Sequence, residues 1–340
     1  GNRPKGRHAL VEPALVLHPV PRSRNVIVFF DPGTRLLDDQ AAPVGYRANR
    51  QIHVPLTGLF AGQQLLVGLQ PSAFSQEILQ AGGNAFDAAV AVSAALAVVE
   101  PAGSGMGGGG LWLLHVAETG RNVMIDGREE APSAATATMY QDDRGEVIKG
   151  LSRNGPLAAA IPGQPAGVVH LAERYGRLPL ARSLAPAIRL AREGFVVDEH
   201  MYRRLQVRRD VMLRSPAASR VFLPGGLPVR VGQVLKQPDL ARTLELLASN
   251  GHDGFYDGDM AQRLVRGVRT AGGIWSLQDL ADYEIREREP IVYERDGIRL
   301  ISAPPPSSGG VVLKQVMHVL ALTDALNLPE IDRKHVVIEA

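Results

Sequence analysis

Three short segments combine residue types that could bind a ligand. The first is Asp126 to Pro132, in which Arg128 stands among acidic residues where a strand is expected to end. A planar guanidinium binds a carboxylate at two points, which makes Arg128 a candidate carboxylate-binding residue. The same pattern also fits an internal salt bridge from Arg128 to Asp126, Glu129 or Glu130, and the residues alone favour that simpler interpretation.

Two loop segments rich in glycine or proline are further candidates. In Ser104 to Gly110, the missing β-carbons let backbone N–H groups face a ligand or let two chain segments approach closely. The run lacks the spacing of a phosphate-binding P-loop and no strand precedes it, which disfavours nucleotide binding. In Pro304 to Gly310, prolines deliver Ser307 and Ser308 just before an expected helix. Ser308 could cap that helix, or the loop could line a site.

Most other catalytic chemistries find little support. The chain has no cysteine, which excludes disulfides, thiolate catalysis and Cys-ligated zinc. None of its nine histidines stands in a metal-ligand spacing, and no Ser-His-Asp triad can be drawn. The acidic pairs Glu129-Glu130 and Asp257 with Asp259 are more typical of a solvated surface, although a paired-carboxylate mechanism stays open. No cofactor and no metal is indicated.

Composition and charge are those of an ordinary globular protein with one large or two smaller domains. Of the 340 residues, 45% are hydrophobic and 21% charged, and no apolar run reaches the ~18 residues of a membrane-spanning helix. Residues 1–60 carry eight basic and four acidic side chains, and residues 61–340 carry 29 and 31. We therefore expect neither a nucleic-acid nor a membrane partner.

The chain opens with Gly1 and shows no signal-peptide pattern, which suggests a processed chain or a fragment.

The residue pattern divides the chain at about residue 60. Residues 1–60 read as an irregular N-terminal segment of unknown role with one short strand at 25–30. In residues 61–340 we expect a buried helix at 85–99, capped by Asn84, and a β-hairpin that places Arg128 at a strand exit. The hairpin strands are expected at 111–116 and 123–126, further strands at 65–69, 291–293 and 298–302, and further helices at 75–80, 166–175, 180–193, 238–249, 258–271, 277–283 and 311–325.

Taken together, these segments resemble the large subunit of the γ-glutamyltranspeptidase family, within the N-terminal-nucleophile hydrolases. The resemblance is long and collinear, running from roughly residue 65 to residue 340. It is carried by the segments at 78–91, 100–101, 104–110, 126–132, 161–163, 166–167, 175–179, 184–191, 193–195, 237–241, 253–256, 271–273, 277–283 and 304–310.

That resemblance implies an α/β (α+β) fold, the four-layer αββα sandwich with a mostly helical middle. The family is made as a single precursor, a zymogen, that cuts itself into a large and a small subunit. The N-terminal threonine of the small subunit is the nucleophile: its α-amino group takes the hydroxyl proton, and the hydroxyl attacks a γ-glutamyl amide such as glutathione. Water or an amino acid resolves the acyl-enzyme. The family arginine that matches Arg128 holds the α-carboxylate of the donor, so Arg128 becomes the expected substrate-binding residue.

The resemblance also implies that the catalytic residues lie outside this chain. The family nucleophile lies downstream of the helix matching residues 335–340, and Thr323, the only threonine after residue 270, stands inside an expected helix. We therefore expect residues 61–340 to be a large-subunit region truncated before the nucleophile, inactive alone and paired with the small subunit as a heterodimer. Because many family members are periplasmic or extracellular, the resemblance implies one of these two locations. Alternatives are a glutaryl-cephalosporin acylase or poly-γ-glutamate depolymerase of the same fold, or a non-catalytic degenerate fragment.

Overall fold

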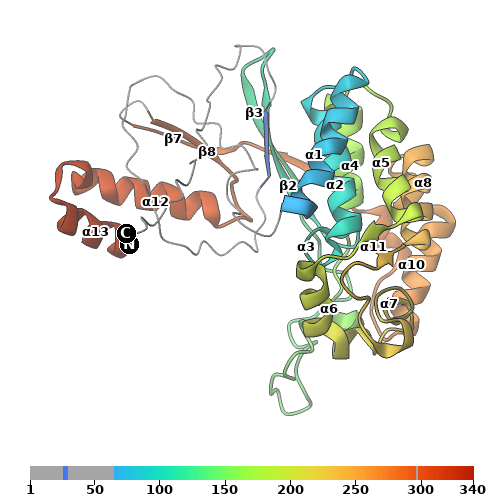
Figure 1. Ribbon diagram of the computed structural model, residues 1–340. Coiled ribbons are helices and arrows are strands. Elements are labelled where there is room, and N and C mark those ends of the chain that lie inside the picture. Colours follow the sequence, from blue (N-terminus) through green and yellow to red (C-terminus); the bar gives the residue numbers. More distant parts are fainter. Residues whose placement is uncertain (1–25, 30–64, 296–297) are drawn as a thin grey trace, which may run out of the picture.

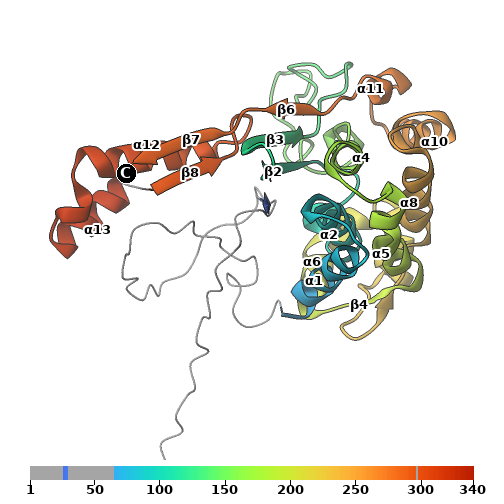
Figure 2. The same ribbon diagram turned by 90° about the horizontal axis from the view of Figure 1, so that it is seen from above.

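A four-stranded antiparallel sheet lies between a layer of helices and a projecting arm of two strands and two helices (Figures 1 and 2). The computed structural model describes residues 26–29, 65–295 and 298–340, and the fold is α+β. No helix among these residues has the length and apolar character needed to cross a membrane.

The described elements fall into three groups. The strands of the main sheet are β1 (Val26–Phe29), β2 (Gly110–Val116), β3 (Arg121–Gly127) and β6 (Arg286–Arg288). Two strand pairs stand apart, β4 (Phe195–Val196) with β5 (Val234–Leu235) and β7 (Ile291–Arg295) with β8 (Ile298–Ser302). The helices are α1 (Leu65–Gln80), α2 (Ala85–Val99), α3 (Pro101–Ser104), α4 (Gln164–Tyr175), α5 (Leu180–Glu193), α6 (Glu199–Met212), α7 (Pro216–Phe222), α8 (Pro238–Asn250), α9 (Asp253–Tyr256), α10 (Gly258–Thr270), α11 (Leu277–Ala281), α12 (Gly309–Leu322) and α13 (Glu330–Glu339).

The main sheet has the order β1-β2-β3-β6. β2 and β3 form the expected hairpin, and Gly120 in its turn has a φ of 67°, a conformation that favours glycine. β6 comes from far along the chain and pairs with the end of β3, so that Asp126 lies opposite Arg286. This register brings the arginines of β6 to the strand end from which Arg128 emerges.

Both faces of the β2–β3 hairpin are apolar. Side chains alternate between the faces of a strand. Trp112 and Leu114 therefore pack into the helical layer, whereas Leu111 and Leu113 pack on the opposite face with Ala303. A sheet with two apolar faces is covered on both sides, as the inner sheet of a sandwich is.

Helix α2 is the centre of the helical layer. Its sequence is almost entirely alanine and valine, and twelve of its fifteen residues are buried. Hydrogen bonds attach it to its surroundings: the indole N–H of Trp112 donates to Ser93 Oγ at 3.1 Å, and the side-chain amide of Gln237 donates to the carbonyl of Val98 at 2.7 Å. The helix thus links the main sheet to the outer helices.

The start of α2 depends on a fully buried carboxylate. Asn84 caps the helix by accepting hydrogen bonds from the backbone N–H groups of Phe86 and Asp87. Asp87, at 0% exposure, accepts in return from Asn84 N at 2.8 Å and also from the backbone N–H groups of Arg177 and Leu178. A buried carboxylate is tolerated because N–H groups compensate for its lost hydration. Asp87 thereby joins the α1–α2 corner to the loop before α5.

Most of the expected elements are confirmed with ends shifted by a few residues, including α2 and the hairpin. β1 confirms the short strand expected at 25–30, while the rest of residues 1–60 and the boundary at residue 60 lie outside the described residues. The strand expected at 65–69 is wrong, because these residues begin helix α1. A short apolar run fits a strand or a helix equally well, and only its continuation decides.

We expect Asp87→Asn to lower the free energy of unfolding by about 2–4 kcal/mol, since the amide loses acceptor capacity and buries N–H donors without partners. Urea denaturation followed by circular dichroism measures the loss. Asp143→Asn, at an exposed loop position, is the matched control and should change stability by less than about 0.5 kcal/mol. Equal stability of the Asp87 variant would show that its hydrogen bonds contribute nothing net.

Candidate functional site

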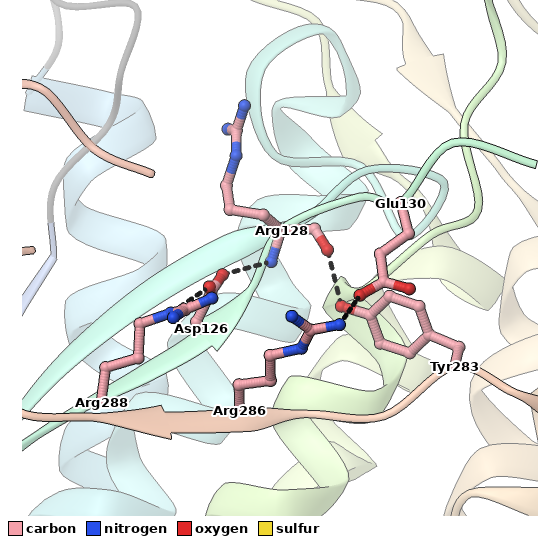
Figure 3. A network of polar contacts seen from close by, with 6 residues as sticks. All are labelled: Asp126, Arg128, Glu130, Tyr283, Arg286 and Arg288. Carbon is pink, nitrogen blue, oxygen red and sulfur yellow. Dashed lines mark hydrogen bonds and ion pairs between the residues drawn. The ribbon is translucent and has the colours of Figure 1, made fainter. Parts of the chain in front are cut away.

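The turn that follows β3 is fixed by Asp126. Its side chain is 7% exposed, and one carboxylate oxygen accepts a hydrogen bond from the backbone N–H of Arg128 at 3.1 Å. The other oxygen lies 2.7 Å from Nε of Arg288, on β6 (Figure 3). Because an ion pair and a backbone hydrogen bond meet on one carboxylate, the chain leaves β3 in a defined direction.

Arg128 points its guanidinium away from this cluster (Figure 3). Its side chain is 43% exposed, and among the described residues its ion pair joins Nε to Glu129 Oε2 at 3.7 Å. The other two carboxylates proposed as salt-bridge partners are taken by arginines of β6: Arg288 holds Asp126, and Nη2 of Arg286 lies 3.0 Å from Glu130 Oε1. In the described part of the chain, neither Nη atom of Arg128 has a hydrogen-bond or ion-pair partner. The bidentate edge of its guanidinium is therefore available.

A column of three stacked rings supports Arg128 from the other side. The hydroxyl of Tyr283 donates to the backbone carbonyl of Arg128 at 2.7 Å. The ring of Tyr283 stacks on Tyr256 at 5.5 Å between centroids, and Tyr256 stacks on His252 at 4.4 Å. Burial raises the pKa of the Tyr283 hydroxyl, and the nearby carboxylates of Glu130 and Asp126 raise it further. The phenol therefore stays protonated and remains a donor at neutral pH.

The glycine run packs directly behind this segment. A β-carbon on Gly109 would lie 2.5 Å from the carbonyl oxygen of Gly127 and 3.0 Å from Cα of Arg128. The carbonyl of Gly108 accepts hydrogen bonds from the backbone N–H groups of Gly163 and Gln164, each at 2.9 Å. The structure thus bears out the interpretation of the run as a tightly packed loop, and the backbone it packs against is that of Arg128.

A shallow, open pocket with a volume of about 130 Å³ lies in front of these residues. Pro306 brings the proline-rich loop to its rim, so two of the candidate segments line it and the third, the glycine run, lies behind it. Ser308 occupies the N-cap position of α12 but makes no side-chain capping hydrogen bond. The lining residues are Asp126, Arg128, Glu129, Glu130, Tyr283, Glu284, Arg286, Arg288 and Pro306.

Four residues of this site were not among the sequence candidates: Tyr283, Glu284, Arg286 and Arg288. The alternation Arg-Glu-Arg at 286–288 is a signal for a strand with both arginines on one face, but three residues are too few to separate it from a loop. The intervening Glu287 points elsewhere and accepts hydrogen bonds from Tyr175 and His170. Burial alone would raise the pKa of Glu287, but these two hydrogen bonds, together with the charges of His170 and Arg121, hold the pKa below its usual value.

The other carboxylates do not assemble into a second site. Glu129 and Glu130 each pair with a different arginine, and Asp257 and Asp259 are exposed. Within residues 65–295 and 298–340, no group of three or more His, Asp or Glu side chains is placed to hold a metal ion.

Comparison with known proteins gives consistent results. Residues 72–340 match the family described as gamma-glutamyltranspeptidase. The chain is 44% identical over 245 residues to a glutathione hydrolase proenzyme of Pseudomonas sp. (strain A14), covering 72% of this chain and 42% of that protein. It is 40% identical over 277 residues to an acylase ACY 1 proenzyme of Pseudomonas sp. (strain SE83), covering 79% of this chain and 50% of that protein. The chain thus spans about half the length of the curated relatives it matches.

The fold comparison agrees with the sequence comparison. The crystal structure of Helicobacter pylori gamma-glutamyltranspeptidase superposes with a TM-score of 0.77 at 37% identity. It covers 84% of this chain and 82% of the solved chain. Such a similarity confirms the N-terminal-nucleophile hydrolase fold expected from the sequence.

We expect Gly109→Ala to lower the free energy of unfolding by about 1–3 kcal/mol, because the new methyl group meets backbone atoms that cannot move aside without shifting Arg128. Thermal unfolding measures the effect. Gly107→Ala is the control within the same run, since its β-carbon would have nothing within 4 Å. If the two variants unfold alike, the close packing behind Arg128 is not what the run provides.

Proposed function

Because the chain belongs to the γ-glutamyltranspeptidase family, we propose that it is the large-subunit part of a γ-glutamyltransferase or glutathione hydrolase. In this proposal residues 61–340 supply the structural core and the side chain that binds the donor's carboxylate. The observation that supports this proposal is the guanidinium edge of Arg128, which is unpaired within the described part of the chain. Arg128 is the pocket arginine whose two Nη atoms are free of protein partners among the described residues, while Arg286 and Arg288 are each held by a carboxylate.

Arg128 is suited to a carboxylate for geometric and electrostatic reasons. The guanidinium offers parallel N–H groups in a fixed plane, which match the two oxygens of a carboxylate. Its backbone is held at both ends of the residue, by Asp126 at the N–H and by Tyr283 at the carbonyl. Little backbone movement is then needed when a substrate binds, so less of the binding energy is spent on ordering the site.

The chemical step is proposed to take place on a small subunit. A threonine at its N-terminus would use its own α-amino group as the base and attack the γ-glutamyl carbonyl through its hydroxyl. The C–N bond of the amide breaks, the amine leaves with a proton, and water or an amino acid later releases the glutamyl group. Arg128 takes no part in bond breaking: it holds the α-carboxylate, so that the γ-carbonyl lies at a fixed distance from the nucleophile.

The arm of the molecule has the surface that a small subunit would cover. Large apolar side chains on α12 and α13 are exposed, among them Leu322 at 73%, Ile331 at 74% and Ile338 at 79%. Contiguous exposed apolar residues mark interaction surfaces in soluble proteins. The relatives are proenzymes, which supports a partner chain made from the same precursor.

The alternative with specific support is an acylase of the same fold. The 40% identity to an acylase proenzyme favours it nearly as much as the hydrolase relatives favour the first proposal. A glutaryl donor has the carboxylate that Arg128 would bind but lacks the α-amino group. Comparing turnover of a γ-glutamyl anilide with that of a glutaryl anilide separates the two, since a γ-glutamyl enzyme should strongly prefer the first.

The complete gene product should appear as two chains after purification, the smaller beginning with threonine. Intact mass determination and N-terminal sequencing of the second chain check this expectation. A single uncleaved chain that is nevertheless folded would contradict the self-processing part of the proposal.

Arg128→Ala should lower kcat/KM for a γ-glutamyl anilide roughly 100-fold, mostly through KM, because a charge-assisted bidentate contact is lost. A 4-aminobutyryl anilide, which lacks the α-carboxylate, should be turned over equally by the variant and the wild type. Arg182→Ala, at an exposed arginine of α5, is the control and should leave both activities unchanged. An equal loss with the carboxylate-free donor would show that the substitution disturbs the fold and not the carboxylate contact.

A further inference from the structure

The region of α6 and α7 is more positively charged than the chain as a whole. Residues 199–230 contain seven arginines, no lysine and two acidic residues, a formal charge of +5 against +2 for the entire chain. The net charge of residues 61–340 is close to zero and therefore does not reveal this local excess of positive charge. Six of these arginines are exposed and are named here the arginine surface: Arg203, Arg204, Arg208, Arg214, Arg220 and Arg230.

Helix α6 presents part of this surface around an exposed valine. The helix buries Met201 and Leu205 against the core. Arg204 and Arg208 are one helical turn apart, and Val207 lies between them with 81% of its area exposed. Val207 is thus an exposed aliphatic side chain flanked by cations, on the side of the helix away from its buried residues.

The charge of the arginine surface is not neutralised within its own region. Glu199 pairs with Arg203 at 3.6 Å and Asp210 with Arg209 at 3.4 Å, which uses both local acidic residues. Four arginines have no side-chain hydrogen bond or ion pair among residues 65–295 and 298–340: Arg204, Arg214, Arg220 and Arg230. Their guanidinium groups are open to an external anion.

The accompanying apolar residues indicate what kind of anion. Besides Val207, the region exposes Leu213 at 41% and Leu227 at 56%, and Val231, directly after it, is 48% exposed. A site for single-stranded nucleic acid would expose aromatic rings for base stacking. The aromatic residues of this region, Tyr202 and Phe222, are half-buried. Arginines with exposed aliphatic side chains fit phosphate headgroups above an acyl boundary, where both kinds of side chain find a partner.

We propose that the arginine surface docks the protein on a bilayer that contains anionic phospholipid. The guanidinium groups pair with headgroup phosphates, and Val207 enters the boundary between headgroups and acyl chains. The contact is peripheral and depends on salt, because exposed charges are screened within a Debye length. Helices α6 and α7 lie together at one end of the helical layer (Figure 1), and they share no lining residue with the pocket of Arg128. Docking therefore leaves that pocket open.

Cosedimentation of the full-length protein with vesicles tests the proposal. We expect binding to phosphatidylcholine vesicles that contain phosphatidylglycerol, weaker binding at high salt, and none to pure phosphatidylcholine vesicles. The variant Arg204→Glu/Arg208→Glu/Arg214→Glu should bind at least roughly 100-fold more weakly, given the contribution of each basic residue near an anionic surface. Val207→Ser keeps every charge and should weaken binding about threefold or more, through the lost apolar contact.

The control is a variant with the same change in net charge on another helix. Arg263→Glu/Arg266→Glu/Arg269→Glu reverses three exposed arginines of α10, where no large aliphatic side chain is exposed. It should bind within about twofold of the wild type, because these charges lie outside the docking face. If the variant Arg204→Glu/Arg208→Glu/Arg214→Glu unfolds early in a thermal melt, Arg204→Gln/Arg208→Gln/Arg214→Gln replaces it.

Three outcomes would overturn the proposal. Wild-type protein that stays in the supernatant with anionic vesicles has no docking surface. An equal loss in the α10 control would mean that net charge, not this surface, drives binding. A Val207→Ser variant that binds vesicles like the wild type, together with equally tight binding of soluble polyphosphate, would indicate a site for polyanions and not for a bilayer.

Discussion

The pocket depends on one nearly buried carboxylate, that of Asp126. Taking a carboxylate out of water is costly unless charge and hydrogen bonds replace the lost hydration, and Arg288 and the backbone N–H of Arg128 do so together. Because the two partners come from different parts of the chain, satisfying this one side chain also sets the pairing of β3 with β6. The direction of Arg128 is therefore a consequence of the same interaction that closes the edge of the sheet.

Arginines with similar surroundings end in different states at this site. Arg286 and Arg288 both extend from β6 and are paired, whereas Arg128 follows β3 and keeps its Nη atoms unpaired among the described residues. The carboxylates of Asp126 and Glu130 pair with Arg288 and Arg286 and not with the side chain of Arg128. In such a site one arginine is left to bind an anion, while the paired charges hold the loop in place. Ligand binding and loop stability therefore depend on different residues of one short segment.

The sequence predicts what is local and misses what is assembled from distant segments. The composition of α2, its Asn84 cap and the hairpin turn are read directly from neighbouring residues, and all are confirmed. The strand expected at 65–69 is wrong because a short apolar run has no period that identifies it. Helix α6 was not predicted because its two buried residues leave a weak apolar period among arginines. Tyr283 touches Arg128 across 155 positions of the chain, and no pattern near either residue reports that contact.

Strand β1 has a consequence for assembly and solubility. Its four residues pair with β2, and Val26 lies opposite His115, so the outer edge of the hairpin is covered by a segment from much earlier in the chain. An uncovered edge of apolar β-strand is a template for pairing with another molecule. Contacts between residues so far apart form late, because the loop between them must first be closed. Until that pairing forms, the edge of β2 is open to intermolecular association, and afterwards β1 is the outermost strand of the described sheet on that side.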